Sequence, residues 1–153
     1  MEEERMRIPV RLALTCAFIV LASAACSTPK IVVLGDPLSA QEHVDLGLAY
    51  EQKGLFALAE KEYLKAAEMK AAWAVPYFNL GNLACRKQDL KTAEGYYRRA
   101  LELDPNPDIM NNLAIVLHGM NRTDEALAMI ERALSIQRKD EYLDTENTIK
   151  GAK

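Results

Sequence analysis

The 153-residue sequence predicts an all-α fold made of three stacked helix-turn-helix units. The first observation is an internal repeat, because the stretch that begins at Asp45 recurs at Asn79 and again at Asn112, at spacings of 34 and 33 residues. The second is helical periodicity, because the same apolar positions recur one helical turn apart within every unit. The third is composition, since 50% hydrophobic residues supply enough apolar surface for a core and argue against disorder.

The repeats are expected at about residues 40–73, 74–106 and 107–138. In the second half of each unit, small and bulky apolar residues recur at i, i+4 and i+7, which places them on one face of a helix. These residues are Ala59, Tyr63 and Ala66 in the first unit, Ala93, Tyr97 and Ala100 in the second, and Ala126, Ile130 and Ala133 in the third.

Helix boundaries carry the expected signals. Ser39 followed by Glu42 forms a capping box, in which the two side chains satisfy free amides at a helix start. Gly54 separates the first two helices, and Asp89 and Thr123 stand where N-caps are expected.

Small residues at one equivalent position predict how the helices of a unit meet. Gly47, Gly81 and Ala114 occupy this position, although glycine inside a helix costs about 1 kcal/mol relative to alanine. We therefore expect the facing helix to come too close for a larger side chain. On that helix, Ala59, Ala93 and Ala126 are the expected complements, with Tyr63, Tyr97 and Ile130 filling the space beside them.

The tail at residues 139–153 has two interpretations. It is mostly polar but contains Tyr142, Leu143 and Ile149, which fits a helix that caps the repeat array with a polar outer face. The alternative is a frayed C-terminal tail.

The first 25 residues are expected to be a secretory signal peptide. Arg5, Arg7 and Arg11 precede an uncharged apolar run at 12–25, which is shorter than the ~20 residues that a membrane-spanning helix needs. Acidic residues at 2–4 are unusual for such a segment, so either Met1 or Met6 is the natural start.

Residues 22–26 read Ala-Ser-Ala-Ala-Cys and resemble a bacterial lipobox, which implies cleavage before Cys26 and attachment of acyl chains such as palmitate to it. An ordinary cleavage site with Cys26 nearby is the alternative. Residues 26–38 then form a short tether. Ser27 is similar to the residue that follows the lipidated cysteine in lipoproteins sorted to the outer membrane, on its periplasmic side.

Cys85 remains unpaired, and the simplest expectation for it is a small buried hydrophobe.

Charge and side-chain chemistry argue against several functions. A net charge of −3 disfavours nucleic acid as a partner. His43 and His118 lie 75 positions apart and belong to no recognisable catalytic or metal-binding pattern. We therefore expect neither an enzyme nor a bound metal or cofactor.

The repeated positions resemble the tetratricopeptide repeat (TPR). The match covers roughly residues 40–138 and rests on Leu46-Gly47, Tyr50, Gly54, Ala59, Tyr63 and Ala66, then Tyr77, Leu80-Gly81, Ala93, Tyr97, Ala100 and Asp104-Pro105, then Leu113-Ala114, Ala126, Ile130 and Ala133. Ala71 and Arg138 depart from the family's usual proline. The resemblance implies a right-handed solenoid and, with the lipobox, a small bacterial TPR lipoprotein.

In TPR proteins the first helix of each unit lines a concave groove that takes a peptide or a helix of a partner. Carried onto matching positions, the resemblance implies a groove of Gln41, Val44, Leu48, Glu51, Gln52, Val75, Phe78, Asn82, Cys85, Arg86, Asp108, Asn111, Ile115 and His118. Asn82 and Asn111 would hold a peptide backbone, and Phe78, Leu48 and Ile115 would take apolar side chains. The alternative for Val44, Leu48 and Ile115 is packing between units.

One TPR subtype is disfavoured. TPR domains that bind chaperone tails clamp a terminal carboxylate with Lys and Asn, and Val44 and Leu48 stand at two of those positions here. The resemblance to small TPR lipoproteins implies a membrane-anchored scaffold in assembly of a bacterial envelope structure, such as a pilus, secretin or exopolysaccharide machinery. A regulator that docks a peptidoglycan hydrolase or peptidase, and a self-associating structural protein, are the alternatives.

Overall fold

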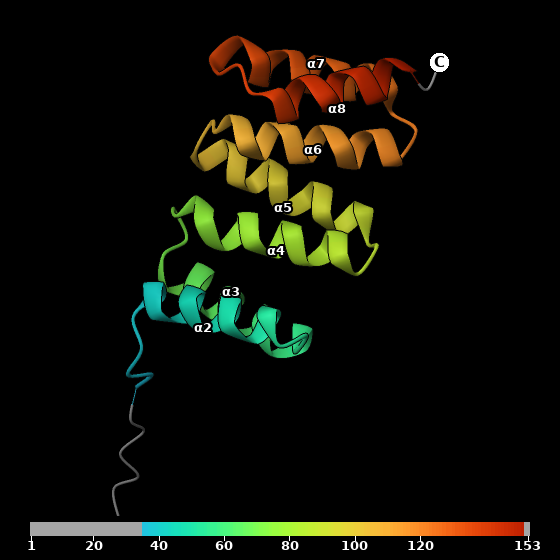
Figure 1. Cartoon of the computed structure of the whole chain (residues 1–153). Coiled ribbons are helices and arrows are strands. Elements are labelled where there is room, and N and C mark those ends of the chain that lie inside the picture. Colours follow the sequence, from blue (N-terminus) through green and yellow to red (C-terminus); the bar gives the residue numbers. More distant parts are fainter. Residues whose placement is uncertain (1–34, 152–153) are drawn as a thin grey trace, which may run out of the picture. The chain divides into compact units, whose positions relative to one another are not determined.

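The computed structural model describes residues 35–151, and within that range it contains helices and turns but no strand (Figure 1). The expected signal peptide, Cys26 and most of the tether lie outside the described residues. The helices are α2 (Ala40–Gln52), α3 (Phe56–Met69), α4 (Ala74–Arg86), α5 (Leu90–Leu103), α6 (Pro107–Gly119), α7 (Thr123–Ile136) and α8 (Asp140–Gly151).

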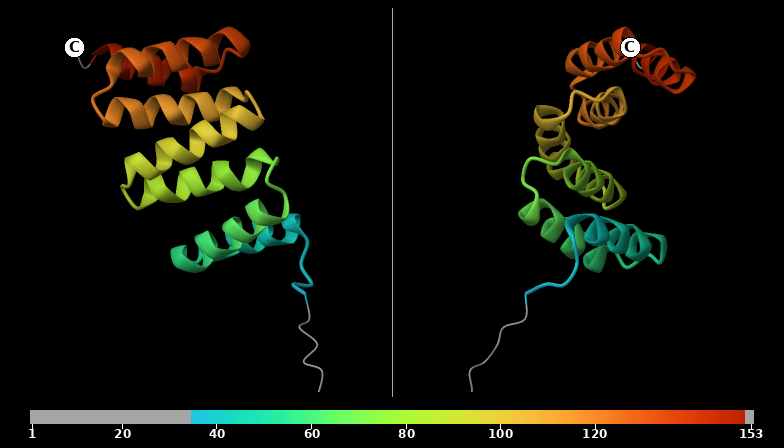
Figure 2. Two further views of the ribbon diagram at one scale, coloured as in Figure 1. Left: turned by 180° about the vertical axis from the view of Figure 1, so that it is seen from behind. Right: turned by 90° about the vertical axis from the view of Figure 1, so that its left-hand side faces the viewer.

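The helices stack as consecutive antiparallel pairs. The closest packing joins α2 to α3, α4 to α5 and α6 to α7, and each pair also packs against the next. In the right-hand view of Figure 2, α2, α4, α6 and α8 lie on one side of the stack and α3, α5 and α7 lie on the other. The prediction of an all-α solenoid with three helical hairpins is therefore confirmed.

A tyrosine ring of the second helix packs directly on the glycine of the first. A Cβ atom at Gly47 would lie 2.4 Å from Cε1 of Tyr63, and one at Gly81 would lie 2.5 Å from Cε1 of Tyr97. Carbon atoms do not approach so closely, so a side chain at either position would force the tyrosine ring to shift. The expected close approach is thus made by the ring of the facing helix rather than by its alanines.

In the third hairpin, different residues pack together at the equivalent positions. Ala114 replaces the glycine and Ile130 replaces the tyrosine, and both are fully buried in one core cluster. Because isoleucine is shorter than tyrosine, it leaves space for the alanine methyl group.

The three turns inside the hairpins share one backbone geometry. The N–H of Leu55 donates to the C=O of Tyr50, and the N–H of Gly54 donates to the C=O of Glu51, which together form a Schellman motif. Gly54 has a φ of 72°, in the left-handed region. The same bonds recur at the next two turns, where Gln88 and Asn121 adopt a φ of 61°.

Two of the three expected N-caps are present. The hydroxyl of Ser39 accepts from the N–H of Glu42, whose carboxylate accepts from the N–H of Ser39, so the capping box is confirmed. The Asp89 carboxylate accepts from the N–H of Thr92 at 3.1 Å.

The expected N-cap at Thr123 is wrong. Helix α7 begins at Thr123 itself, and the cap position belongs to Arg122, whose side chain makes no capping hydrogen bond. The guanidinium of Arg122 instead bridges Glu94, at 2.7 Å, and Glu125, at 2.6 Å. An ion-pair bridge between neighbouring hairpins thus occupies the place where a cap was expected.

The C-terminal segment forms the capping helix rather than a frayed tail. Tyr142 and Ile149 of α8 are 0% and 1% exposed, respectively, and both join the core cluster of the last two hairpins. Asn147 stands where the earlier hairpins carry glycine or alanine, and its side chain is exposed because no helix packs there. None of the helices in residues 35–151 combines the length and the apolar character that crossing a bilayer requires.

We predict that Gly81→Ala destabilises the fold. The added methyl group meets two buried ring atoms of Tyr97, and such overpacking costs about 1–3 kcal/mol. The helix-propensity gain of about 1 kcal/mol offsets only part of this cost over most of that range. The free energy of unfolding, measured by urea denaturation, should fall by up to about 2 kcal/mol after both effects.

Gly95→Ala is the matched control, since Gly95 lies within α5 with nothing near its missing Cβ. This change should raise the free energy of unfolding by about 0.5–1 kcal/mol. Adding Tyr97→Ile to Gly81→Ala, as in the third hairpin, should cost less than the two single changes summed. Strict additivity would contradict the proposed contact.

Candidate functional site

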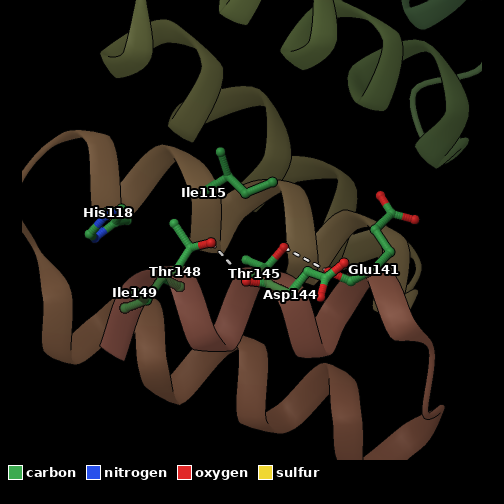
Figure 3. Close-up of a pocket in the computed structure, with 7 residues that line it drawn as sticks. All are labelled: Ile115, His118, Glu141, Asp144, Thr145, Thr148 and Ile149. Atoms are coloured by element: carbon green, nitrogen blue, oxygen red, sulfur yellow. Dashed lines mark hydrogen bonds between the residues drawn. The ribbon is translucent and has the colours of Figure 1, made fainter. Parts of the chain in front are cut away.

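Three adjoining cavities line the face formed by α2, α4, α6 and α8. The first, of about 570 Å³, lies between α6 and α8 and is bounded by Ile115, His118, Glu141, Asp144, Thr145, Thr148 and Ile149 (Figure 3). The second, of about 330 Å³, is bounded by Ala74, Val75, Phe78, Asp104, Asn106, Asp108, Ile109, Asn112 and Glu141. The third, of about 350 Å³, is bounded by Glu51, Asn82, Cys85, Arg86, Tyr97, Asn112 and Ile115.

These cavities share wall residues and so form one surface, which we call the groove. Glu141 belongs to the first and second cavities, Asn112 to the second and third, and Ile115 to the first and third. A ligand longer than a single side chain would therefore contact several helices at once.

Asn82 is the polar centre of the groove. Its Oδ1 accepts from the Tyr97 hydroxyl at 2.7 Å and from Nδ2 of Asn112 at 3.1 Å. The Sγ of Cys85 lies 3.5 Å from the same hydroxyl. Burial raises the pKa of Tyr97, so this hydroxyl remains a donor at neutral pH. The amide nitrogen of Asn82 makes no hydrogen bond within residues 35–151, which leaves it able to donate to a ligand.

The α2 end of the groove is electrically balanced. Glu51 accepts from the Tyr63 hydroxyl at 2.8 Å, and its other carboxylate oxygen lies 2.9 Å from Nε of Arg86. Burial and the neighbouring Glu51 raise the pKa of Tyr63. One carboxylate and one guanidinium therefore offset each other at this end.

The third hairpin lacks the hydroxyl that the first two bring to the groove. Tyr63 and Tyr97 each direct an O–H toward a groove residue, whereas Ile130 stands at the equivalent position of α7. His118 occupies the place that corresponds to Glu51, and its buried Nδ1 has no hydrogen-bond partner within the described residues. His118 thus lines the first cavity while its Nδ1 is buried beneath the surface.

Helix α8 is attached to the groove through Asp108. This carboxylate accepts from the hydroxyl of Tyr142 and from Nζ of Lys139, which lies 2.5 Å away. The bonds from Lys139 and Tyr142 hold the pKa of Asp108 below its usual range, and the same ion pair raises the pKa of Lys139.

The structure brings most of the predicted groove residues together. Those that line the cavities are Glu51, Val75, Phe78, Asn82, Cys85, Arg86, Asp108, Ile115 and His118. Gln41, Leu48 and Gln52 are exposed on α2 but line none of these cavities. Most of the predicted residues that line the cavities therefore belong to α4 and α6.

Two predicted groove residues need correction, because they are buried in the fold. Val44 is 2% exposed and packs in the core of the first hairpin. Asn111 is 1% exposed, so it cannot hold a peptide backbone in the open groove. The neighbouring Asn112 is the asparagine that faces the groove, one residue away in the helix.

Several groove residues were missed by the sequence reasoning. Asn112 lies 33 positions after Asn79 and so occupies the equivalent place in the next unit. This spacing does not indicate which of the adjacent residues Asn111 and Asn112 is accessible. Glu141 and Asp144 were missed because the tail was not assigned as a helix. The usable signal was the pair Tyr142 and Ile149, which lie seven residues apart and so on one face of a helix.

One equivalent position of helices α2, α4, α6 and α8 alternates between apolar and polar side chains. Leu48, Asn82, Ile115 and Thr148 occupy this position in α2, α4, α6 and α8, and each follows directly on the residue at the small-residue position. The series therefore reads apolar, amide, apolar and hydroxyl along the stack.

Within residues 35–151, no three His, Cys, Asp or Glu side chains are grouped so that they would hold a metal ion. His43 is fully buried beside Glu62, with Nδ1 2.7 Å from the carboxylate, and lines none of the three cavities. Cys85 is a half-buried free thiol, and burial raises its pKa.

Comparison with known proteins identifies the repeat. Two family models, both described as "Tetratricopeptide repeat", match residues 43–72 and 71–139. Over 65 residues the chain is 32% identical to the Arabidopsis thaliana "Cell division cycle protein 27 homolog B", a match that covers 42% of this chain and 9% of that protein.

Two similar solved structures agree on the fold. The "First TPR of Spaghetti (RPAP3) bound to HSP90 peptide SRMEEVD" superposes with a TM-score of 0.72 and 19% identity, over 78% of this chain and 97% of that one. The "Arabidopsis OM64 TPR domain" gives a TM-score of 0.71 and 18% identity, over 75% of this chain and 97% of that one.

We predict that Asp108→Asn loosens α8 while leaving the other helices intact. At neutral pH, hydrogen exchange of α8 amides should accelerate by about three- to tenfold, because a charge-assisted contact is lost at a half-exposed site. The amides of α5 should keep their rates.

Acidification should remove the same contribution from the unaltered chain. Because the pKa of Asp108 is lowered in the folded state, its stabilisation is present at neutral pH and is lost as the pH falls through that lowered value. The difference in α8 exchange between the two proteins should therefore disappear at strongly acidic pH. A difference that persists there would contradict this role for Asp108.

Proposed function

We propose that this chain, which belongs to the tetratricopeptide repeat family, holds a peptide or a helix of a protein partner in its groove. The observation that carries the proposal is the continuity of the three cavities across α4, α6 and α8, which gives an extended ligand several helices to contact. Recognition of extended segments uses hydrogen bonds to the backbone together with pockets for side chains.

The groove offers both kinds of contact. The amide of Asn82 is held by Tyr97 and Asn112, so it is fixed in position and donates to a peptide carbonyl at little entropic cost. Phe78 on one side and Ile115, 51% exposed, on the other supply apolar surface for side chains. Partner binding would cover this surface.

The RPAP3 structure supports a peptide as the class of ligand, since its title names a bound HSP90 peptide. We do not extend that ligand to this chain. The first unit has Val44 and Leu48 at positions where the resemblance places a carboxylate clamp, and Val44 is buried. The proposed partner is therefore not a chaperone tail.

We further propose that the chain works at a bacterial membrane. The support is in the sequence, where residues 1–25 have the form of a signal peptide and Cys26 ends a lipobox-like stretch. A lipid on Cys26 and a tether of twelve residues that reaches at most about 40 Å would keep the groove near the membrane surface. Assembly of a pilus, a secretin or an exopolysaccharide machinery at the outer membrane is the proposed context.

Crosslinking in cells followed by mass spectrometry tests the partner-binding role. The full chain should capture a specific envelope protein, and Phe78→Ala and Asn82→Ala should each reduce that capture by about fivefold or more, as expected for central contacts worth about 1 kcal/mol or more.

Leu58→Ala and Asn147→Ala are the matched controls, because both side chains are exposed and line none of the groove cavities. They should leave capture unchanged, with folding checked by circular dichroism in all four variants. Equal capture by the groove variants and the unaltered chain would refute the groove as the binding site.

The lipid anchor is tested separately with Cys26→Ser. The unaltered chain should fractionate with membranes, whereas the serine variant should be soluble in the exported fraction, because it lacks the thiol that receives lipid. Recovery of the variant with membranes at the original level would count against anchoring through Cys26.

A further inference from the structure

The charge of the groove is uneven along its length. The walls of the first and second cavities contain four carboxylates, Asp104, Asp108, Glu141 and Asp144, and no lysine or arginine. The third cavity, by contrast, pairs Glu51 with Arg86. Negative charge therefore accumulates toward the α8 end.

Most of these carboxylates are not neutralised by the protein. Asp108 is paired with Lys139, but Asp104, Glu141 and Asp144 form no ion pair within residues 35–151. Asp144 lines the first cavity, Asp104 lines the second, and Glu141 belongs to both, so the three negative charges lie along one stretch of the groove.

Helix stability accounts for only part of this pattern. Glu141 lies in the first turn of α8, where a carboxylate offsets the helix dipole. Asp144 lies beyond the first turn, and Asp104 precedes α6, so the dipole does not explain them. The hydroxyls of Thr145 and Thr148 donate to backbone carbonyls of their own helix (Figure 3). They therefore donate no hydrogen bond to the carboxylates of Glu141 and Asp144.

Apolar surface lies beside the acidic groups. Ile115 is 51% exposed and Val75 is 39% exposed, although both side chains are large and hydrophobic. In the first cavity, Ile115 of α6 stands opposite Thr145 and Thr148 of α8, and His118 belongs to the same wall (Figure 3). The site thus combines negative charge with an apolar surface.

We propose that the α8 end of the groove takes a basic, amphipathic segment of the partner protein. Lysine or arginine side chains of that segment face Glu141, Asp144 and Asp104, while their aliphatic stems and neighbouring apolar residues rest on Ile115 and Val75. The inference rests on the proposed function and specifies the chemistry of the partner.

The test uses the full chain and three short synthetic peptides. One alternates lysine with leucine, one replaces every lysine by glutamate, and one replaces every lysine by glutamine. Amide chemical shifts in NMR spectra should change at Ile115, Thr145 and Thr148 with the lysine peptide. Affinity should follow the order lysine, glutamine, glutamate, and should weaken as salt is raised.

Charge variants identify the groups responsible. Glu141→Gln combined with Asp144→Asn should weaken binding of the lysine peptide about three- to tenfold, as expected for the loss of two exposed ion pairs. The matched control, Asp124→Asn with Asp140→Asn, also removes two exposed carboxylates from helix first turns, but outside all three cavities. It should leave the affinity unchanged.

The outcomes separate this inference from the function on which it rests. If the glutamine or glutamate peptide binds the groove as tightly as the lysine peptide, or if both double variants bind alike, the preference for a basic partner is refuted while peptide binding stands. If none of the peptides shifts the groove signals and crosslinking also captures no partner through Phe78 and Asn82, both proposals fail.

Discussion

The contact between a tyrosine ring and a glycine determines how this stack of helices is built. The rings of Tyr63 and Tyr97 lie where the side chains of Gly47 and Gly81 would otherwise be, which brings the two helices of a hairpin close together. Each ring is almost completely buried, so it contributes a large apolar surface to the core. A hairpin of two short helices has few other large side chains to bury, and its stability therefore depends on this pair.

The same tyrosines connect the core to the groove. A tyrosine that is long enough to cross the hairpin brings its hydroxyl to the opposite helix, where Glu51 and Asn82 accept it. Asn82 is thereby fixed by the packing that stabilises the fold. The third hairpin, with Ile130 in place of tyrosine, has no such hydroxyl, and the groove there contains the unsatisfied His118 and the acidic side chains of α8.

Features that follow from a repeated pattern could be predicted from the sequence. Features that depend on a shift of one residue along a helix could not. The small residues at one position and the larger apolar residues that face them predicted the three hairpins, because both recur at a fixed place in every unit. Asn111 and Asn112 are adjacent and chemically identical, and only the helix rotation buries the first and exposes the second. The sequence did not decide between a helix and a frayed tail at α8. Only Tyr142 and Ile149 mark the buried face of this helix, and two residues do not establish a helical period.

The series Leu48, Asn82, Ile115 and Thr148 has an evolutionary consequence. Each of these residues adjoins the small-residue position, yet its side chain is at least partly exposed. Among the four, only Asn82 bonds to a core side chain, because it accepts the hydroxyl of Tyr97. Evolution can therefore vary the first, third and fourth positions of the series more freely than the second, where a change would remove the acceptor of a core tyrosine.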